Sequence, residues 1–141
     1  MSLKPLIRRL HEIWSTGDTA AVEAVYAADF VAHFPPSSRM PERRGLEAVR
    51  QGIAGIRSAF PDWREHIEEL VEEGDRVASR YTSTGTHRGA FWGIAATGRP
   101  VSVPEISIYR IAGGKVAEQW CMLDELARMQ QLGARLARPG E

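Results

Sequence analysis

The stretch VSVPEISIYRIAGGKVAEQWCMLD, residues 101–124, decides the fold. Apolar and polar residues alternate on both sides of the pair Gly113-Gly114. A Gly-Gly pair between two alternating runs is typical of a β-hairpin with a tight turn. The stretch therefore predicts two antiparallel strands, at about 101–111 and 115–124.

The sequence before this hairpin begins with helices. Apolar residues at helical spacing predict a first helix from Leu3 that ends at Gly17, and a longer helix over 46–60 that Pro61 stops. Asp18 can cap a short helix between the two, carrying Val22, Val25 and Tyr26. A short extended piece is predicted at 30–33.

From about residue 64 onward, the pattern of apolar and polar residues changes to a period of two, which is the period of a β-strand. It predicts strands at 64–72 and 76–86 joined by Gly74-Asp75, then a loop over 88–98 before the hairpin. A last helix is predicted at 125–132, and a loose tail at 134–141. Helices grouped on one face of an antiparallel sheet define the α+β class, which we expect here as a single domain over 1–141.

Composition excludes several classes of protein. The 141 residues carry 18 Lys and Arg against 18 Asp and Glu, so the formal net charge is zero. A neutral chain argues against a nucleic-acid binder or a polybasic membrane-surface protein. The single cysteine, Cys121, cannot form an internal disulfide, so we expect a cytoplasmic protein. The four histidines do not have the spacing of a metal site, so we expect no bound metal.

The hairpin also predicts which side chains share a face, if Ala112 lies opposite Lys115. Directly opposed residues share a face of the sheet, whereas a three-residue loop would reverse one strand relative to the other. With the first geometry, one face combines aromatic rings with carboxylates, the composition of a ligand cavity. Its members are Val103, Glu105, Ser107, Tyr109, Glu118, Trp120, Met122 and Asp124. The other face, with Ile106, Ile108, Cys121 and Leu123 beside Arg110, Ala117 and Gln119, is apolar enough to be covered by a partner subunit.

An ordered set of short motifs resembles the SnoaL-like polyketide cyclases, also called ester cyclases. The resemblance covers about 6–133. Its motifs are His33-Phe34-Pro35, Ala59-Phe60-Pro61-Asp62, Gly85-Thr86-His87-Arg88-Gly89 with Gly93, Thr97-Gly98-Arg99, Ile108-Tyr109-Arg110-Ile111, Gly114-Lys115-Val116, Glu118-x-Trp120, Asp124 and Gln131-Leu132-Gly133.

This resemblance implies a fold like that of nuclear transport factor 2, in which a bent antiparallel sheet wraps around the helices as a cone with an internal cavity. It also implies homodimers or homotetramers. The family's cyclases close a ring by intramolecular aldol condensation of a polyketide ester without metal or organic cofactor. Asp124 matches the family's acid/base aspartate, and Trp14 matches a cavity-lining aromatic residue.

Three residues are the candidates for catalysis: Asp124, His87 and His33. A desolvated carboxylate beside Trp120 and Met122 would have a raised pKa, suited to moving a proton α to a carbonyl. Asp124 is equally a good N-cap for the helix over 125–132. His87 either contacts the substrate or Asp124, or anchors its loop to the backbone. His33 is expected at the cavity rim.

The candidate substrate-binding residues are mostly aromatic: Trp14, Phe60, Tyr81, Glu105, Trp120, Met122, Phe91 and Trp92. Side chains such as those of Trp14, Phe60, Tyr81, Trp120 and Met122 belong more often to a core than to a ligand site. Phe91-Trp92, between Gly89 and Gly93, suggests a flap or an oligomer contact, and Glu105 is either an acid/base partner or half of an ion pair. His11 is expected on the surface, and His66 in a solvated strand edge with Glu65, Glu68, Glu69, Glu72 and Glu73.

Three further functions remain open. An isomerase or epoxide hydrolase on the same scaffold would also use carboxylates in an apolar cavity. A non-catalytic protein that holds a hydrophobic metabolite needs only the cavity. A purely oligomeric scaffold would fill that cavity with its aromatic side chains.

Overall fold

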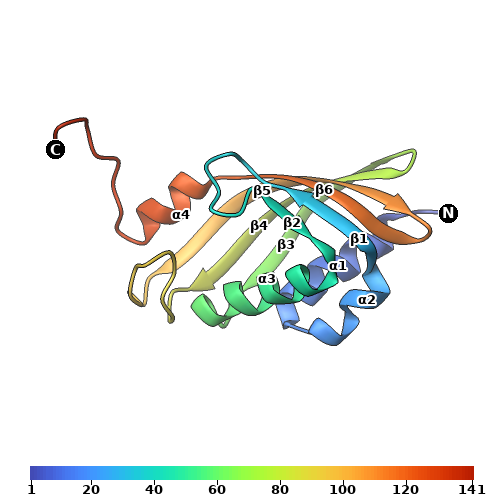
Figure 1. The fold of residues 1–141 in the computed structure, drawn as a ribbon, viewed down its shortest axis with the longest axis horizontal. Helices are drawn as coiled ribbons and strands as arrows, with labels where there is room; N and C mark the ends of the chain where they lie inside the picture. Colours follow the sequence, from blue (N-terminus) through green and yellow to red (C-terminus); the bar gives the residue numbers. More distant parts are fainter.

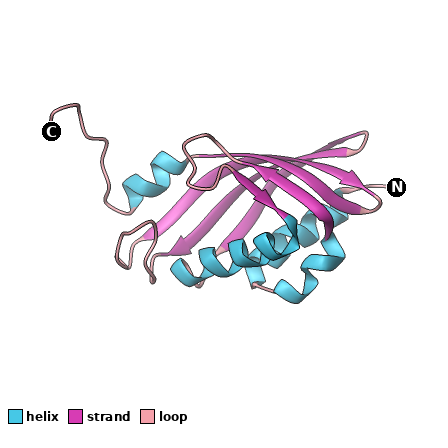
Figure 2. Ribbon diagram, viewed as in Figure 1, coloured by secondary structure: helices cyan, strands magenta, loops and turns pink.

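The computed structural model describes all 141 residues and confirms the α+β class: the helices of the N-terminal half cover one face of a curved sheet, and the C-terminal helix lies at one end of it (Figures 1 and 2). The helices are α1 (Lys4–Thr16), the 3-10 turn η1 (Thr19–Ala21), α2 (Val22–Val25), α3 (Gly45–Ala59) and α4 (Glu125–Gln131). The strands are β1 (Tyr26–His33), β2 (Glu42–Arg44), β3 (Arg64–Glu73), β4 (Arg76–Thr86), β5 (Pro100–Ala112) and β6 (Lys115–Leu123).

The six strands form one sheet in the order β2-β1-β6-β5-β4-β3. Strands β3 to β6 are the predicted antiparallel meander. Strand β1 lies parallel to β6, which the expectation of a purely antiparallel sheet missed. It also begins at Tyr26 rather than at residue 30, because Tyr26 already pairs with Val116. The short edge strand β2 has no signal in the sequence, because its three residues are extended only through their pairing with β1.

The helices bury their apolar faces against the concave side of the sheet. Helix α1 ends where Gly17 adopts a left-handed conformation, with φ of 78°, which favours glycine. It packs on β3, while α3 packs on β1. The main core lies between these layers and includes Ile7, Leu10 and Val49. At the other end of the sheet Phe60, Trp63 and Leu132 join a second, smaller core.

A β-bulge in β6 changes the predicted hairpin. Ile111 pairs with Val116, as predicted from the turn, but Arg110 pairs with Glu118, so Ala117 is an extra residue. A shift of one residue reverses the faces of the rest of the strand. The predicted pairs Tyr109–Glu118, Ser107–Trp120, Glu105–Met122 and Val103–Asp124 are therefore wrong, and Tyr109, Ser107 and Glu105 lie opposite Gln119, Cys121 and Leu123. Glu118, Trp120 and Met122 lie on the outer face.

The two ends of the chain lie at opposite ends of the molecule (Figure 1). Residues 134–141 form neither helix nor strand and extend from α4 away from the sheet. None of the helices combines the length and the apolar character needed to cross a membrane.

Candidate functional site

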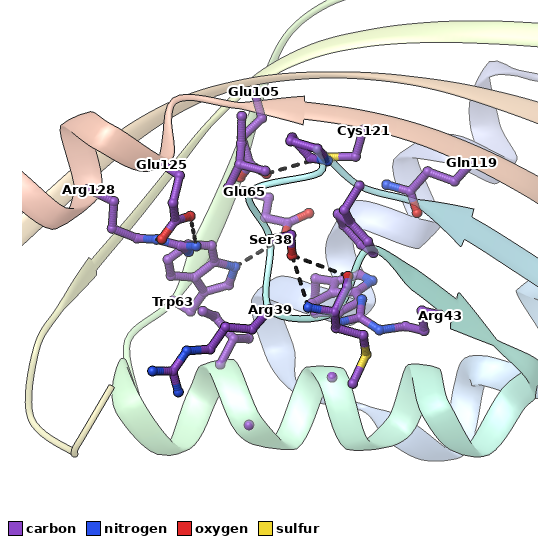
Figure 3. Close-up of a pocket in the computed structure, with 18 of the residues that line it drawn as sticks. Ser38, Arg39, Arg43, Trp63, Glu65, Glu105, Gln119, Cys121, Glu125 and Arg128 are labelled. Atoms are coloured by element: carbon purple, nitrogen blue, oxygen red, sulfur yellow. Dashed lines mark hydrogen bonds and ion pairs between the residues drawn. The ribbon is translucent and has the colours of Figure 1, made fainter. Parts of the chain in front are cut away.

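A pocket of about 430 Å³ lies between the concave face of the sheet and α3. Half of its 26 lining residues are hydrophobic. Its aromatic lining comes from Trp14, Phe34, Trp63, Tyr81, Phe91, Trp92 and Tyr109. The polar side chains drawn in Figure 3 include Arg43, Glu65, Glu105, Gln119 and Arg128. Aromatic walls with a few placed polar groups are typical of a small-molecule site.

Glu105 is the carboxylate that β5 directs into this pocket. Ser83 donates a hydrogen bond to it, and the Tyr81 hydroxyl lies 3.4 Å from Oε1. Cys121 Sγ lies 3.8 Å from the same oxygen. Burial raises the pKa of Glu105 to about 7, helped by the negative charge of Glu65 and opposed by the bond from Ser83. Glu105 is thus a carboxyl group that exchanges a proton near neutral pH.

A second carboxylate, Glu65, enters the pocket from β3 and is held by two partners. Its Oε1 lies 2.8 Å from His11 Nδ1, and its Oε2 accepts a hydrogen bond of 3.1 Å from Trp63 Nε1. His11 Nε2 lies 2.8 Å from Ser79 Oγ, so the imidazole is fixed at both nitrogens. Glu105 has a buried carboxylate as its neighbour, and like charges in a buried site favour protonation of one of them.

Two loops and an ion pair border the pocket. Arg39, from the loop between β1 and β2, stacks on Trp92 with 5.3 Å between guanidinium carbon and ring centroid. Arg128 of α4 stacks on Phe91 at 4.7 Å and forms an ion pair with Glu125. The predicted flap residues Phe91 and Trp92 therefore line the pocket and are stacked against arginines from two other segments.

Several residues predicted to bind substrate meet in this pocket. Trp14, Tyr81, Glu105, Phe91 and Trp92 all line it. Phe60 does not line it: this residue is fully buried and packs against Trp63, His87 and Phe91. No group of three or more His, Cys, Asp or Glu side chains has the arrangement of a metal site.

Trp120, Met122 and His33 lie on the opposite face of the sheet, in an outer groove with Ile106 and Ile108. The expectation that they face the cavity or its rim is wrong: the bulge at Ala117 turns Trp120 and Met122 of β6 outward, and His33 of β1 pairs with Trp120 beside them. His33 stacks on Trp120 with centroids 5.6 Å apart, and its Nε2 lies 2.7 Å from Glu118 Oε2. Met122 is 66% exposed.

Asp124 and His87 also lie outside the pocket lining. Asp124 is exposed, and its Oδ1 accepts a hydrogen bond of 3.0 Å from the backbone of Ala127, which makes it the N-cap of α4. His87 is buried, and its Nδ1 accepts a 3.1 Å hydrogen bond from the backbone N–H of Thr97. His87 thus closes the loop that leads to β5, while its Nε2 has no partner.

The expectations for His11 and Glu65 are wrong. His11 is 2% exposed rather than on the surface, and Glu65 is not part of the solvated edge. His66, Glu68, Glu69 and Glu73 are exposed as predicted, and Glu72 is partly buried. The sequence holds a signal for His11: it follows Ile7 by four residues and Leu10 by one, which places it beside the apolar face of α1.

The fold and the pocket together define a class of protein: a small cone-like α+β domain whose concave sheet and N-terminal helices border a pocket with partly buried carboxyl groups. The model of the family "SnoaL-like polyketide cyclase" matches residues 4–132. The chain belongs to this family, whose members share the fold of nuclear transport factor 2.

Curated relatives within the family come from Streptomyces. The chain is 34% identical over 134 residues to the aklanonic acid methyl ester cyclase DauD of Streptomyces sp. (strain C5), covering 91% of this chain and 80% of DauD. It is 33% identical to the aklanonic acid methyl ester cyclase DnrD of Streptomyces peucetius, covering 91% of this chain and 88% of DnrD.

Solved structures agree with the fold. IdmH from Streptomyces antibioticus superposes with a TM-score of 0.82 at 28% identity, covering 95% of this chain and all of IdmH. TsrD from Streptomyces laurentii gives the same TM-score at 30% identity, covering 94% of this chain and 95% of TsrD.

Proposed function

We propose that this protein closes a carbon ring in a polyketide-like ester, or a related small carbonyl compound, by a cofactor-independent intramolecular aldol reaction. The observation that carries the proposal is Glu105, a partly buried carboxyl group in an aromatic pocket, whose pKa is raised to about 7. General acid–base catalysis is most effective when the pKa of the group lies near the working pH. The family and the two curated ester cyclases support the choice of reaction.

The reaction needs one proton to leave a carbon and one to reach an oxygen. The Glu105 carboxylate removes a proton from the carbon α to a carbonyl, and the resulting enolate carbon attacks a second carbonyl carbon of the same molecule. A carbon–carbon bond forms, and the electron pair of that carbonyl moves to its oxygen. Protonated Glu105 returns the proton to this alkoxide, so the product is an isomer of the substrate and Glu105 is regenerated.

Tyr81 supports the acid/base group from β4. Its hydroxyl lies 3.0 Å from Ser107 Oγ and 3.4 Å from Glu105 Oε1. Burial keeps the pKa of Tyr81 well above its ordinary value, so the phenol stays protonated and remains a donor. It can hydrogen-bond the Glu105 carboxylate or the oxygen that becomes negative during ring closure.

Two carboxylates compete for the acid/base role. Asp124 matches the family position, whereas Glu105 is the one that lies in the pocket. We assign the role to Glu105, because Asp124 is exposed and its carboxylate caps α4. Proton transfer needs a group within hydrogen-bond reach of the substrate, and a side chain inside the pocket meets that condition.

The direct test is an assay with aklanonic acid methyl ester and related keto-esters, in which chromatography and mass spectrometry follow a product of unchanged mass. We expect the rate to rise with pH through about 7 as Glu105 ionises. Glu105→Gln should lower turnover by roughly 10²–10⁴-fold, the usual contribution of an acid/base group. Wild-type turnover in that variant would overturn the assignment, and turnover lost only in Asp124→Asn would return the role to Asp124.

One other function has an observation in its favour. Of the three glutamates that line the pocket, Glu125 is paired with Arg128, which leaves Glu65 and Glu105, and such a pair also suits an isomerase or an epoxide hydrolase. Isomerised enones or diols from the corresponding panels, with no ring closure, would select that function. Tight binding without any turnover would select the metabolite-binding protein.

We also propose that the protein acts in the cytoplasm as a homodimer or homotetramer. The outer face of β5 and β6 exposes Ile106, Ile108 and Met122, 52%, 41% and 66% accessible, next to Trp120. A contiguous apolar patch of this kind is typical of a subunit contact. The single thiol, Cys121, is buried and unpaired, which suits a reducing compartment.

A further inference from the structure

The guanidinium of Arg43 is held between two aromatic rings at the pocket. Arg43 lies on the short strand β2, just before α3, and lines the pocket. Its guanidinium carbon is 5.5 Å from the ring centroid of Trp14 and 5.0 Å from that of Phe34. Trp14 is itself fixed by a 2.8 Å hydrogen bond from its Nε1 to the hydroxyl of Tyr26. The position of the cation is therefore set by packing.

The chain provides this cation with no ion-pair partner. Every ion pair of an arginine with a carboxylate involves other arginines, such as the neighbouring Arg44 with Glu42. Nε of Arg43 is buried and has no hydrogen-bond partner. Burial lowers the pKa of Arg43, and the electrostatic effects of Tyr26, Cys121 and Glu65 oppose this shift. A buried guanidinium nitrogen without a hydrogen-bond partner is costly for the fold, so its presence calls for a role.

Helix α3 makes room for this guanidinium with a glycine. A Cβ on Gly52 would stand 2.7 Å from Cζ of Arg43 and 2.9 Å from Nη2. Glycine inside a helix costs about 1 kcal/mol relative to alanine. Gly55, one turn further along α3, lines the same pocket, and an added Cβ there would touch nothing within 4 Å. Any residue larger than glycine at position 52 would therefore occupy the space that the guanidinium of Arg43 fills.

We propose that Arg43 recognises an oxygen anion, a carboxylate or an ionised hydroxyl group, on a flat aromatic ligand in this pocket. The guanidinium supplies charge-assisted hydrogen bonds to the anion, and the aromatic walls take the rings. Arg43 and Glu105 enter the pocket from separate strands of the sheet, Arg43 from the edge strand β2 and Glu105 from β5, with β1 and β6 between them (Figure 3). Arg43 therefore fixes one end of the ligand while Glu105 faces another part. As a statement about the substrate, this inference rests on the proposed function.

The test compares ligands that differ only in charge. Naphthoate and its uncharged amide have the same rings, and dinitronaphthol, ionised at neutral pH, pairs with its methyl ether. Isothermal titration should show that the anion of at least one pair binds wild-type protein roughly tenfold more tightly than its neutral match. The pair that shows this preference identifies the anion as a carboxylate or an ionised hydroxyl. Equal affinity within both pairs would overturn the proposal.

Three variants locate the effect. Arg43→Gln should reduce the anion preference to less than about twofold, whereas Arg44→Gln, on the same strand but exposed and paired with Glu42, should keep it. Gly52→Ala should weaken the preference because its Cβ displaces the guanidinium, and Gly55→Ala should leave the ratio unchanged. An unchanged preference in both Arg43→Gln and Gly52→Ala would contradict the role of Arg43.

None of these probes has a C–H group α to a carbonyl, so none can undergo the aldol reaction and their binding does not depend on ring closure. A protein that prefers the anions but closes no ring keeps this inference and loses the proposed function. A protein that closes rings but binds each pair equally loses this inference alone.

Discussion

Nδ1 of His11 lies 2.8 Å from Oε1 of Glu65, and their side chains are only 2% and 9% exposed. The contact joins α1 to β3 beneath the pocket. Because Glu65 helps to raise the pKa of Glu105, whatever holds Glu65 in place also acts on the proposed acid/base group. The His11–Glu65 contact therefore contributes both to the stability of the fold and to the electrostatics of the pocket.

Replacing His11 should destabilise the protein strongly. In His11→Leu, Glu65 keeps only the hydrogen bond from Trp63 within the core. Loss of one partner of a buried pair leaves a desolvated charge, and we expect the free energy of unfolding to fall by about 3 kcal/mol. Urea unfolding followed by Trp fluorescence measures this change. His66→Leu is the matched control: His66 is exposed, so its effect should stay within about 0.5 kcal/mol. Similar effects of the two substitutions would refute a structural His11–Glu65 pair.

Glu105 should make the protein less stable as pH rises. Its pKa in the folded protein, about 7, lies above its ordinary value of 4.5, so the folded state binds the extra proton between these values. The stabilisation of the folded state by protonated Glu105 is complete below pH 4.5 and is lost as pH rises through about 7. The loss amounts to at most about 3 kcal/mol. Asp62 and Glu118, whose hydrogen bonds lower their pKa, change stability only at more acidic pH.

The variant that isolates this effect is Glu105→Gln, which keeps the size of the side chain and removes the titration. We expect its free energy of unfolding, measured by urea titration from pH 4.5 to 8, to be nearly flat where that of the wild type declines. Parallel curves for the two proteins would show that Glu105 does not titrate in this range.

Most elements could be predicted from the sequence because their signals are local. Strand β4 has the predicted bounds, and α1, α3, β3 and β5 lie within about two residues of the predictions, as Gly17, Pro61 and Gly113-Gly114 set clear ends. The faces of β5 also follow from alternation, and the predicted grouping of Glu105, Ser107 and Tyr109 on one face is confirmed. Strand β2 could not be predicted, since three residues pair only because β1 is already in place.

The composition of the site could be predicted only in part, because one extra residue in β6, Ala117, exchanges the two faces of the strand beyond it. Val116 and Ala117 are both buried, and this adjacent apolar pair is the trace that the bulge leaves in the sequence. A count of alternate residues from the turn takes no account of the bulge and therefore places Trp120 and Met122 on the wrong face of the sheet. A similar register shift in β3, between Ile67 and Glu69, hides the inward position of Glu65 among exposed glutamates.

Asp124 should affect stability more than catalysis. Its carboxylate caps α4, so Asp124→Ala should cost about 1 kcal/mol of stability, whereas Asp124→Asn should retain the cap. Because Asp124 is exposed and outside the pocket lining, we expect both variants to close rings at close to the wild-type rate. Thermal unfolding and the keto-ester assay measure the two effects. A stable Asp124→Asn protein without turnover would show that the aspartate reaches the substrate after all.

Ile108 provides the test of the proposed subunit contact. It lies at the centre of the outer face, opposite Trp120 and between Ile106 and the Arg110–Glu118 ion pair along β5. A glutamate there would place an unpaired charge within a buried apolar contact, which is strongly unfavourable. We therefore expect Ile108→Glu to remain folded and to become a monomer, as measured by light scattering after size-exclusion chromatography. Leu136→Glu, at an exposed leucine in the C-terminal segment, should keep the wild-type mass. If Ile108→Glu also keeps that mass, or if the wild type is itself a monomer, the outer face of β5 and β6 is not the subunit contact.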